Sequence, residues 1–170
     1  MTVSGPGVPG GALGPGDRAP DFSLSNQFGE PVRLSALRGH PVVLVFYPFA
    51  FSQICTGELG AIRDRPEIFA EAGAEVLAVS VDSKYALRAY GESEGYSFQL
   101  LADFWPHGAV ARRYGVFDEA SGMALRGTFI LDGGGVIRYS VVNPRGQART
   151  IDDYAAALAR IGENDRNRIE

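Results

Sequence analysis

Residues 42–64 read VVLVFYPFAFSQICTGELGAIRD, and this stretch decides the fold. It begins with an uninterrupted apolar run over residues 42–47, which is typical of a strand buried on both faces of a sheet. Pro48 has no N–H group to donate to a neighbouring strand, so we expect the strand to end there. The apolar residues that follow recur at near-helical spacing; they are Ile54, Leu59 and Ile62. The sequence therefore predicts a central strand that leads into a helix, with Cys55 in the first turn of that helix.

The composition is that of a single globular domain. The chain has 170 residues, of which 45% are hydrophobic and 21% charged, and this suffices for one buried core. The net charge of -4 argues against a nucleic acid or an anionic membrane as the main partner, because both need a basic surface. No apolar run approaches the roughly 20 residues that a membrane span needs. Because the first residues form neither a basic nor an apolar leader, we expect a cytoplasmic location.

Cys55 is the only cysteine, and His40 and His107 are the only histidines. A single cysteine cannot form a disulfide within the chain, nor can it supply the group of thiolates that holds zinc. The sequence also contains no glycine-rich phosphate loop and no dinucleotide fingerprint. We therefore expect neither a metal nor a nucleotide cofactor.

Strands alternate with helices along the chain, which predicts a three-layer α/β domain. The expected strands are residues 19–24, 32–34, 42–47, 75–81, 98–101, 128–132 and 136–142. The expected helices are the cysteine helix to residue 72 with a break at Pro66, a short turn capped by Ser35, and residues 83–92, 107–114 and 151–161. A hairpin closed by the glycines at 133–135 adds an antiparallel edge, so the central β-sheet should be mixed, with helices on both faces. We expect a disordered Gly/Pro-rich tail over residues 1–16, one domain over 17–162 and a polar tail over 163–170.

The first turn of a helix is a favourable place for a reactive thiol. Its backbone N–H groups lack partners, and the positive end of the helix dipole lies there, so both favour the thiolate of Cys55. A buried cysteine can also be no more than a small apolar residue, and this position alone leaves that alternative open.

Pro48, Ser52 and Cys55 occur at the spacing P-x-x-x-S-x-x-C within the residues PFAFSQIC. This spacing resembles the active-site motif of the peroxiredoxins, P-x-x-x-[T/S]-x-x-C. The resemblance implies that the Ser52 hydroxyl hydrogen-bonds the sulfur or a bound peroxide, and that Pro48 shields the thiolate from water and over-oxidation. From the residues alone, Ser52 can also be a helix cap and Pro48 a strand end. Many family members have threonine where this chain has Ser52, but the hydroxyl is kept.

Glu58 lies three residues after Cys55, on the same helix face. A lone carboxylate there opposes formation of the thiolate, so a cation must offset it. Arg126, in the segment RGTFILD, matches the arginine that peroxiredoxins bring to the thiolate, and its fork can serve the sulfur, the peroxide and Glu58 together. Arg63 and Arg113 are weaker candidates for the same role, and we expect both to be surface charges.

The resemblance to peroxiredoxins extends over residues 17–160. It includes APDF at 19–22, VSVD at 79–82 and ARRYGV at 111–116. The sequence around Cys55 is most similar to that of the one-cysteine alkyl hydroperoxide reductase E branch of actinobacteria. The resemblance implies a thioredoxin-like fold and a thiol-dependent peroxidase that reduces hydrogen peroxide and organic hydroperoxides.

The same resemblance implies how the reaction ends and what assists it. The sulfenic acid formed on Cys55 is resolved by an external thiol, either mycothiol with a mycoredoxin-like partner or thioredoxin. Loops around the active site form a homodimer, and His107 has no acid–base role. Aromatic residues form an apolar pocket wall, unless they only pack the core; they are Phe46, Phe49, Phe51, Phe104 and Trp105. Two other functions stay open at this point: a thiol peroxide sensor that relays oxidation to a partner, and a non-catalytic thioredoxin-fold binding protein.

Overall fold

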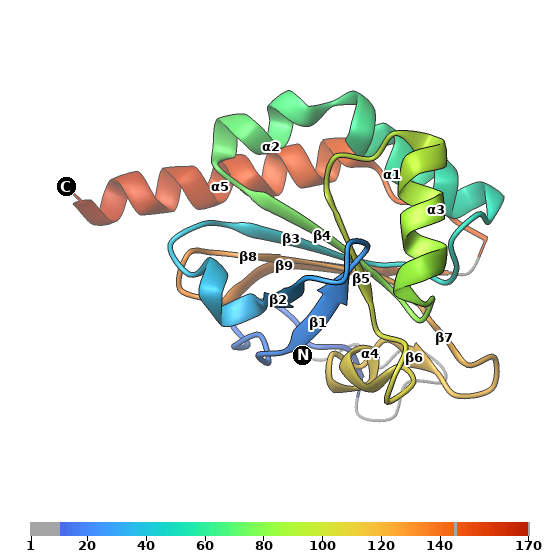
Figure 1. Ribbon diagram of the computed structural model, residues 1–170. Coiled ribbons are helices and arrows are strands. Elements are labelled where there is room, and N and C mark those ends of the chain that lie inside the picture. The colour runs from blue at the N-terminus through green and yellow to red at the C-terminus, as the bar shows by residue number, and fades with distance from the viewer. Residues whose placement is uncertain (1–10, 145, 170) are drawn as a thin grey trace.

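The computed structural model describes residues 11–144 and 146–169, and within them seven strands form one mixed sheet in the order β2-β1-β5-β4-β3-β8-β9 (Figure 1). Their bounds are β1 Ser23–Asn26, β2 Pro31–Arg33, β3 Val42–Phe46, β4 Glu75–Ser80, β5 Gln99–Ala102, β8 Arg126–Leu131 and β9 Ile137–Asn143. The three central strands β3, β4 and β5 run parallel, while β8, β9, β1 and β2 are joined antiparallel. The predicted mixed sheet is therefore confirmed.

Helices cover both faces of the sheet, but unequally (Figure 1). One face carries α1 Gln53–Asp64, α2 Pro66–Ala72, α3 Lys84–Glu94 and α5 Ile151–Ile169. The other face carries the short helix α4 Ala109–Arg113, the 3-10 helix η1 Leu34–Leu37 and the chain before β1. This layering encloses a separate hydrophobic core on each face.

Strand β3 supplies side chains to both cores, as its apolar run predicts. Val43 and Val45 pack in the core under α1 and α5, whereas Leu44 and Phe46 pack in the core under α4. Each such burial contributes roughly 1.5–3 kcal/mol to folding. The chain leaves the sheet just before Pro48, and the last bond toward β4 runs from the Tyr47 N–H to Val79 O over 3.0 Å.

The predicted break at Pro66 is also confirmed. Arg65 ends α1 with φ -127° and ψ 54°, outside the helical region, and Pro66 is the first residue of α2. Proline suits this position because its missing N–H would have no partner in the first turn. Gly73 then ends α2 in the left-handed conformation, with φ 64°.

Four local features depart from the sequence prediction by more than a boundary shift of one or two residues. The first strand covers 23–26 rather than 19–24, because Ala19 and Phe22, an odd number of residues apart, are buried in the same core and so do not alternate between two faces. The 3-10 turn begins at Leu34, so Ser35 lies inside it and is not its cap. A small hairpin of β6 Phe117–Asp118 and β7 Met123–Ala124 was not predicted, since strands of two residues leave no readable alternation. Helix α5 continues to Ile169, eight residues beyond the predicted end, because the polar residues after Gly162 include no proline.

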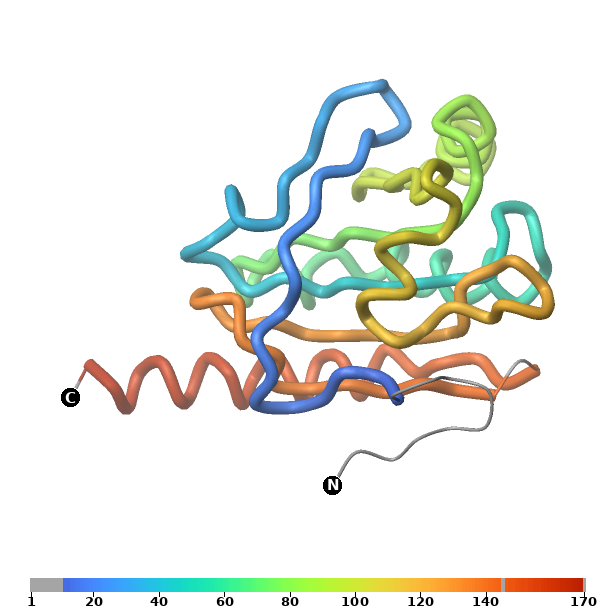
Figure 2. The backbone as a smooth tube through the Cα atoms, turned by 90° about the horizontal axis from the view of Figure 1, so that it is seen from below, coloured from blue at the N-terminus to red at the C-terminus, as the bar shows by residue number. Residues whose placement is uncertain are grey.

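The first described residues run along the body of the domain rather than away from it (Figure 2). The Leu13 N–H donates to Tyr114 O over 3.3 Å, and the Gly16 N–H donates to Ile137 O over 2.8 Å. The expected disordered tail over residues 1–16 is therefore wrong for residues 11–16, which belong to the domain, and residues 1–10 of that tail lie outside the described residues. Within the described ranges, no helix is both long and apolar enough to cross a bilayer.

Candidate active site

Cys55 is the third residue of α1 and is fully buried where that helix leaves the end of β3. The loop of residues 47–52 connects β3 to α1, and Ser52 occupies the N-cap position. The Thr56 N–H donates to Ser52 O over 2.9 Å and so begins the helical ladder. The thiol thus lies in the first turn of the helix, as the sequence predicts.

Arg126, the first residue of β8, reaches the thiol from the neighbouring strand. Strand β8 pairs antiparallel with β3, with Thr128 opposite Val45, so the start of β8 lies beside the end of β3. The Nη1 atom of Arg126 lies 3.4 Å from Cys55 Sγ and also donates to Oε1 of Glu58. All three side chains are buried, so their charges are poorly screened by water.

Glu58 is held by a second arginine, Arg149, which the sequence analysis missed. The backbone N–H and the Nε of Arg149 donate to Glu58 Oε2 over 2.6 and 2.7 Å, and its Nη2 donates to Oε1 over 3.1 Å. Its Nη1 donates to the backbone oxygens of Phe46 and Gly127 over 2.7 and 3.0 Å. Arg149 therefore ties α1 to the ends of both β3 and β8.

The electrostatics of Glu58 follow from this pairing. Burial by itself raises the pKa of the Glu58 carboxyl, but the hydrogen bonds and charge of Arg149, helped by the charge of Arg126, hold that pKa below its ordinary value. Glu58 is therefore a carboxylate that balances two guanidinium groups. The negative charge that the sequence placed near the sulfur is compensated, as we expected, but by two cations rather than one.

The Ser52 hydroxyl is buried and makes no hydrogen bond with any described residue. Although Ser52 holds the N-cap position of α1, its side chain makes no capping bond. Pro48 is buried at the start of the same loop. The nearby Tyr47 hydroxyl is likewise buried with no partner among the described residues, and burial raises its pKa. The loop thus brings an unused hydroxyl to the N-terminal end of α1.

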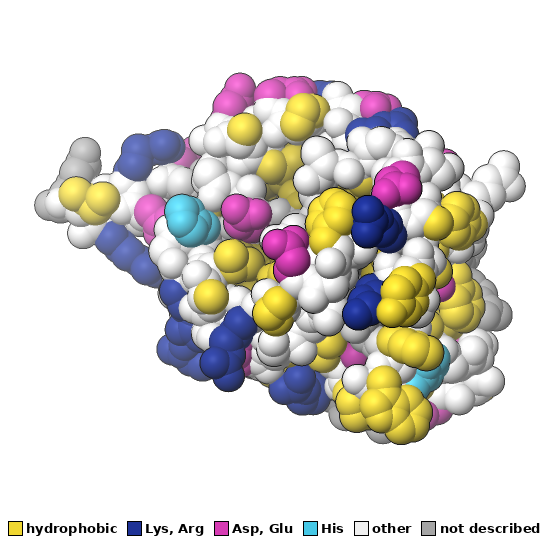
Figure 3. All heavy atoms as spheres, in the orientation of Figure 1, with side chains coloured by type: hydrophobic (Ala, Val, Ile, Leu, Met, Phe, Trp, Pro, Cys, Tyr) yellow, Lys and Arg dark blue, Asp and Glu magenta, His cyan; other side chains and the backbone are white. Residues whose placement is uncertain are grey.

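The aromatic residues expected in a pocket wall divide into two groups. Phe46 is fully buried in the other core, where its ring lies 5.9 Å from that of Phe129, so it is not part of the Cys55 side. Four others are exposed large hydrophobic residues; they are Phe49, Phe51, Phe104 and Trp105. The Phe51 ring lies 4.9 Å from that of Tyr90 on α3, and Trp105 is 82% exposed in the loop after β5. Figure 3 shows hydrophobic side chains gathered over that loop and the lower end of α3.

The weaker arginine candidates are engaged elsewhere. Arg63 pairs with Asp64 and Glu94 at the other end of α1, and exposed Arg113 donates to Asp21 O over 2.8 Å. His107 forms a 2.7 Å hydrogen bond with Gly122 O. Of the residues that the structure describes, no three His, Cys, Asp or Glu side chains gather in a way that could hold a metal ion.

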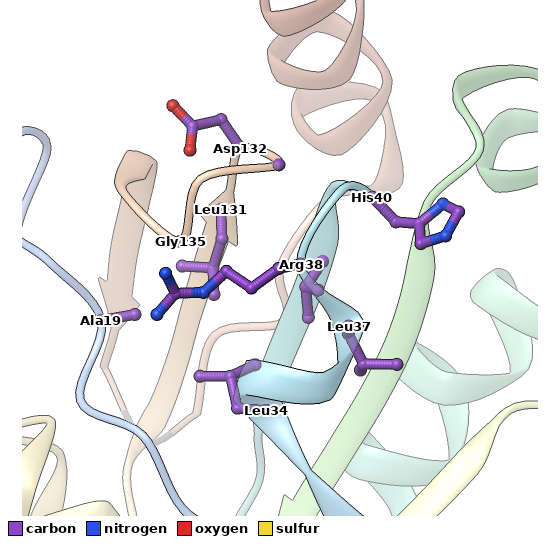
Figure 4. Close-up of a pocket in the computed structure, with 10 residues that line it drawn as sticks. Ala19, Leu34, Leu37, Arg38, His40, Leu131, Asp132 and Gly135 are labelled. Atoms are coloured by element: carbon purple, nitrogen blue, oxygen red, sulfur yellow. The ribbon is translucent and has the colours of Figure 1, made fainter.

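A separate pocket lies at the opposite end of β3, lined by Leu34, Arg38 and Asp132 among others (Figure 4). Its volume is about 10 Å³, which is the space of about one water molecule. Val42, at the start of β3, lines this pocket, so the pocket is remote from Cys55. Its volume is also too small for an organic hydroperoxide.

Comparisons with known proteins agree with this geometry. A family model described as the AhpC/TSA family matches residues 15–140. Alkyl hydroperoxide reductase E of Mycobacterium tuberculosis is 42% identical over 150 residues, which cover 88% of this chain and 98% of the relative. Peroxiredoxin 2 of Thermoplasma acidophilum is 37% identical over 155 residues, which cover 88% of this chain and 76% of the relative. The crystal structure of AhpC from Enterococcus faecalis superposes with a TM-score of 0.77 at 33% identity, covering 86% of this chain and 90% of that chain.

Proposed function

Because the chain belongs to the AhpC/TSA family of peroxiredoxins, it is a thiol-dependent peroxidase with Cys55 as its peroxidatic cysteine, and we propose how its residues share that reaction. The Cys55 thiolate attacks the terminal oxygen of a hydroperoxide in line with the O–O bond. The S–O bond forms as the O–O bond breaks, and the sulfur is oxidised to a sulfenic acid. The departing alkoxide or hydroxide takes up a proton and leaves as an alcohol or water.

The observation that carries this mechanism is the buried contact between Arg126 and Cys55. A guanidinium 3.4 Å from the sulfur stabilises the thiolate before the reaction and the departing oxygen during it. Glu58 and Arg149 keep that guanidinium in place as positioning residues, because they surround it with fixed charges. Ser52 binds the peroxide with its unused hydroxyl, and the buried Pro48 keeps water from the thiolate.

We propose that both hydrogen peroxide and organic hydroperoxides are substrates. Phe49 and Phe51, on the loop that leads to Cys55, are exposed, and so is Trp105 in the loop after β5. Exposed apolar side chains of this kind favour binding of an organic group. Hydrogen peroxide needs no such wall. A pocket variant such as Phe51→Ser should therefore slow the reaction with a bulky alkyl hydroperoxide several-fold more than the reaction with hydrogen peroxide.

The reductant is an external thiol, because Cys55 is the only cysteine of the chain. We favour a low-molecular-weight thiol such as mycothiol, cleared by a mycoredoxin-like protein, with thioredoxin as the alternative. The thiol attacks the sulfenic acid, water leaves and a mixed disulfide forms, which a second thiol then reduces. A reaction that consumes thiols belongs in a reducing compartment, which supports a cytoplasmic location.

A homodimer is the assembly that the exposed aromatic residues favour. Phe104 and Trp105 in the loop after β5 and Tyr85 on α3 are large apolar side chains left open to water. Such groups of exposed apolar residues mark interaction surfaces, and a second copy would cover them. Sedimentation should therefore show a dimer that Trp105→Arg dissociates, whereas Phe28→Arg, outside this loop, should leave it intact. A monomeric wild-type protein would contradict the proposal.

The reaction is tested by the second-order rate of Cys55 oxidation in pre-reduced protein, with sulfenic acid trapped by dimedone and counted by mass spectrometry. We expect a rate orders of magnitude above that of free cysteine, lost in Cys55→Ser and strongly reduced in Arg126→Ala. Turnover should then require mycothiol or thioredoxin. Fast oxidation that neither mycothiol nor thioredoxin resolves, but that a thiol of some other protein does, would instead indicate a peroxide sensor. A rate like that of free cysteine would contradict the mechanism.

A further inference from the structure

A side chain from a neighbouring strand holds the loop between β3 and α1. The backbone N–H of Ala50, in the middle of this loop, donates to Oδ2 of Asp82 over 2.8 Å. Asp82 lies two residues after the end of β4, which pairs in parallel with β3, so both strands deliver their next residues to the same edge of the sheet. We propose that Asp82 is a positioning residue of the peroxidase reaction: it fixes the loop that presents Ser52 to the peroxide. This inference rests on the role proposed above for Ser52.

Asp82 is itself fixed by Ser80, the last residue of β4. The Ser80 hydroxyl donates to the same Oδ2 atom over 2.7 Å and accepts the Asp82 N–H over 3.3 Å. Ser80 is fully buried and its backbone belongs to a central strand. Two donors therefore converge on one carboxylate oxygen whose place is set by the sheet, and hydrogen bonds to a charged acceptor are stronger than those to a neutral one.

The loop needs such a restraint because the residue after Ala50 has a strained backbone. Phe51 has a φ of 67°, in the left-handed region that bulky residues avoid. A strained conformation of this kind persists only where the surrounding structure holds it. Ser52 follows directly, so the turn at Phe51 decides where the Ser52 hydroxyl points. A bond to Ala50 is thus well placed to control that direction.

Asp82 acts on the loop rather than on the thiol. Its carboxylate bonds lead to Ala50 and Ser80, whereas the thiol of Cys55 is contacted by Arg126 from β8. This arrangement predicts that loss of Asp82 separates two reactivities of Cys55. Reaction with a peroxide needs Ser52 in place, but alkylation by iodoacetamide needs only a reachable thiolate.

The test compares Asp82→Ala, Asp82→Asn and Asp82→Glu by their rates with hydrogen peroxide and with iodoacetamide. Asp82→Ala should lower the peroxide rate up to about tenfold, because it acts through the Ser52 hydroxyl and cannot cost more than the loss of that one hydrogen bond. Its alkylation rate should not fall. Asp82→Asn keeps an oxygen acceptor and should stay within about threefold of wild type. Asp82→Glu moves the acceptor by one methylene and should slow the peroxide reaction several-fold.

Ser83→Ala is the matched control, because Ser83 is the next residue and its hydroxyl accepts the Ala86 N–H of α3 rather than an N–H of the loop. It should leave both rates within about twofold. The double variant Ser52→Ala with Asp82→Ala should be little slower than the slower single variant, since both changes act on one hydroxyl.

Two outcomes would overturn the inference. In one, Asp82→Ala keeps the wild-type peroxide rate while Ser52→Ala loses it; Asp82→Glu takes the place of Asp82→Ala if that variant does not fold. In the other, alkylation falls as much as the peroxide reaction. Failure of the proposed mechanism is distinct, because it would show as a wild-type peroxide rate in Cys55→Ser or Arg126→Ala.

Discussion

The thiol of Cys55 lies between two regions that are built in opposite ways. On one side, Glu58 accepts hydrogen bonds from Arg126 and from three nitrogen atoms of Arg149, all of them buried. On the other side, the loop before α1 presents a Ser52 hydroxyl with no partner among the described residues, next to a strained backbone. We call the first region the ion network and the second, residues 47–52, the peroxide loop.

This difference shows how one small site can hold its charges rigidly and still keep a hydroxyl free to bind a ligand. A network whose charges are mutually paired holds its geometry, because moving any member would leave a buried charge without a partner. A buried hydroxyl without a partner is costly for the free protein, and a ligand that bonds to it recovers that cost. We therefore expect changes in the ion network to affect both stability and rate, and changes in the peroxide loop to affect mainly rate.

The largest effect is expected for Arg149→Met, which removes the centre of the ion network. The change takes the two side-chain hydrogen bonds of Arg149 from Glu58 and leaves the buried carbonyl groups of Phe46 and Gly127 without this donor. Loss of one partner of a buried ion pair costs about 3–5 kcal/mol, which urea denaturation can measure as a fall in the free energy of unfolding. Arg88→Met, in an exposed pair on α3, should cost less than about 1 kcal/mol. Equal losses in the two variants would contradict the distinction between them.

Arg126→Ala should have the next largest effect and acts on the reaction itself. Removal of one preorganised group that stabilises developing charge costs about 10²–10³-fold in rate, so the peroxide reaction should slow by that factor. Arg126→Lys should recover only part of the rate, because an ammonium cannot bridge Cys55 and Glu58 as the guanidinium does. Arg63→Ala, which alters a partly exposed arginine on α1, is the control and should stay within about twofold.

Ser52→Ala tests the peroxide loop and should slow the peroxide reaction about tenfold, the equivalent of one hydrogen bond of about 1.4 kcal/mol. Its free energy of unfolding should equal or exceed that of wild type, because the change removes a buried hydroxyl that has no partner among the described residues. Ser52→Thr keeps the hydroxyl and should keep the rate. A clear loss of stability in Ser52→Ala would show that the hydroxyl supports the fold, and the contrast with the ion network would then fail.

The smallest effect is expected in the pH dependence of stability. The pKa of Glu58 is lower in the folded chain than its ordinary value of 4.5, so its carboxylate stabilises the fold fully above that value. This contribution is lost as the pH falls through the folded-state pKa. Glu58→Gln cannot titrate, so its free energy of unfolding should fall less steeply below pH 4.5 than that of wild type. Parallel curves for the two proteins would contradict a stabilising carboxylate.

Local sequence was sufficient to predict the elements that carry the thiol. The apolar run that forms β3, the helix with Cys55 in its first turn and the break at Pro66 each depend on neighbouring residues and on backbone chemistry. Of the two alternatives left open for Phe46, core packing is the one found. The two-residue alternation of a strand carried this signal, since Val45 faces the Cys55 core and Phe46 therefore faces the other.

Arg149 could not have been predicted in the same way. It lies 91 residues from Glu58 in sequence, in a polar segment before α5 where nothing nearby distinguishes it from a surface arginine. Asp82 lies directly before Ser83, the N-cap of α3, and only the parallel pairing of β3 and β4 shows that its carboxylate reaches Ala50.

The sequence by itself determined the nucleophile, the helix that holds it and the class of chemistry, because periodicity and the P-x-x-x-S-x-x-C spacing are properties of a short stretch of chain. The tertiary structure decided which charges surround that nucleophile and which side chains hold its loop. Those partners come from β4, β8 and the segment before α5, and their choice depends on which strand ends the sheet brings together. A residue's neighbours in a folded chain are set by strand order and register, and these depend on the packing of the whole domain.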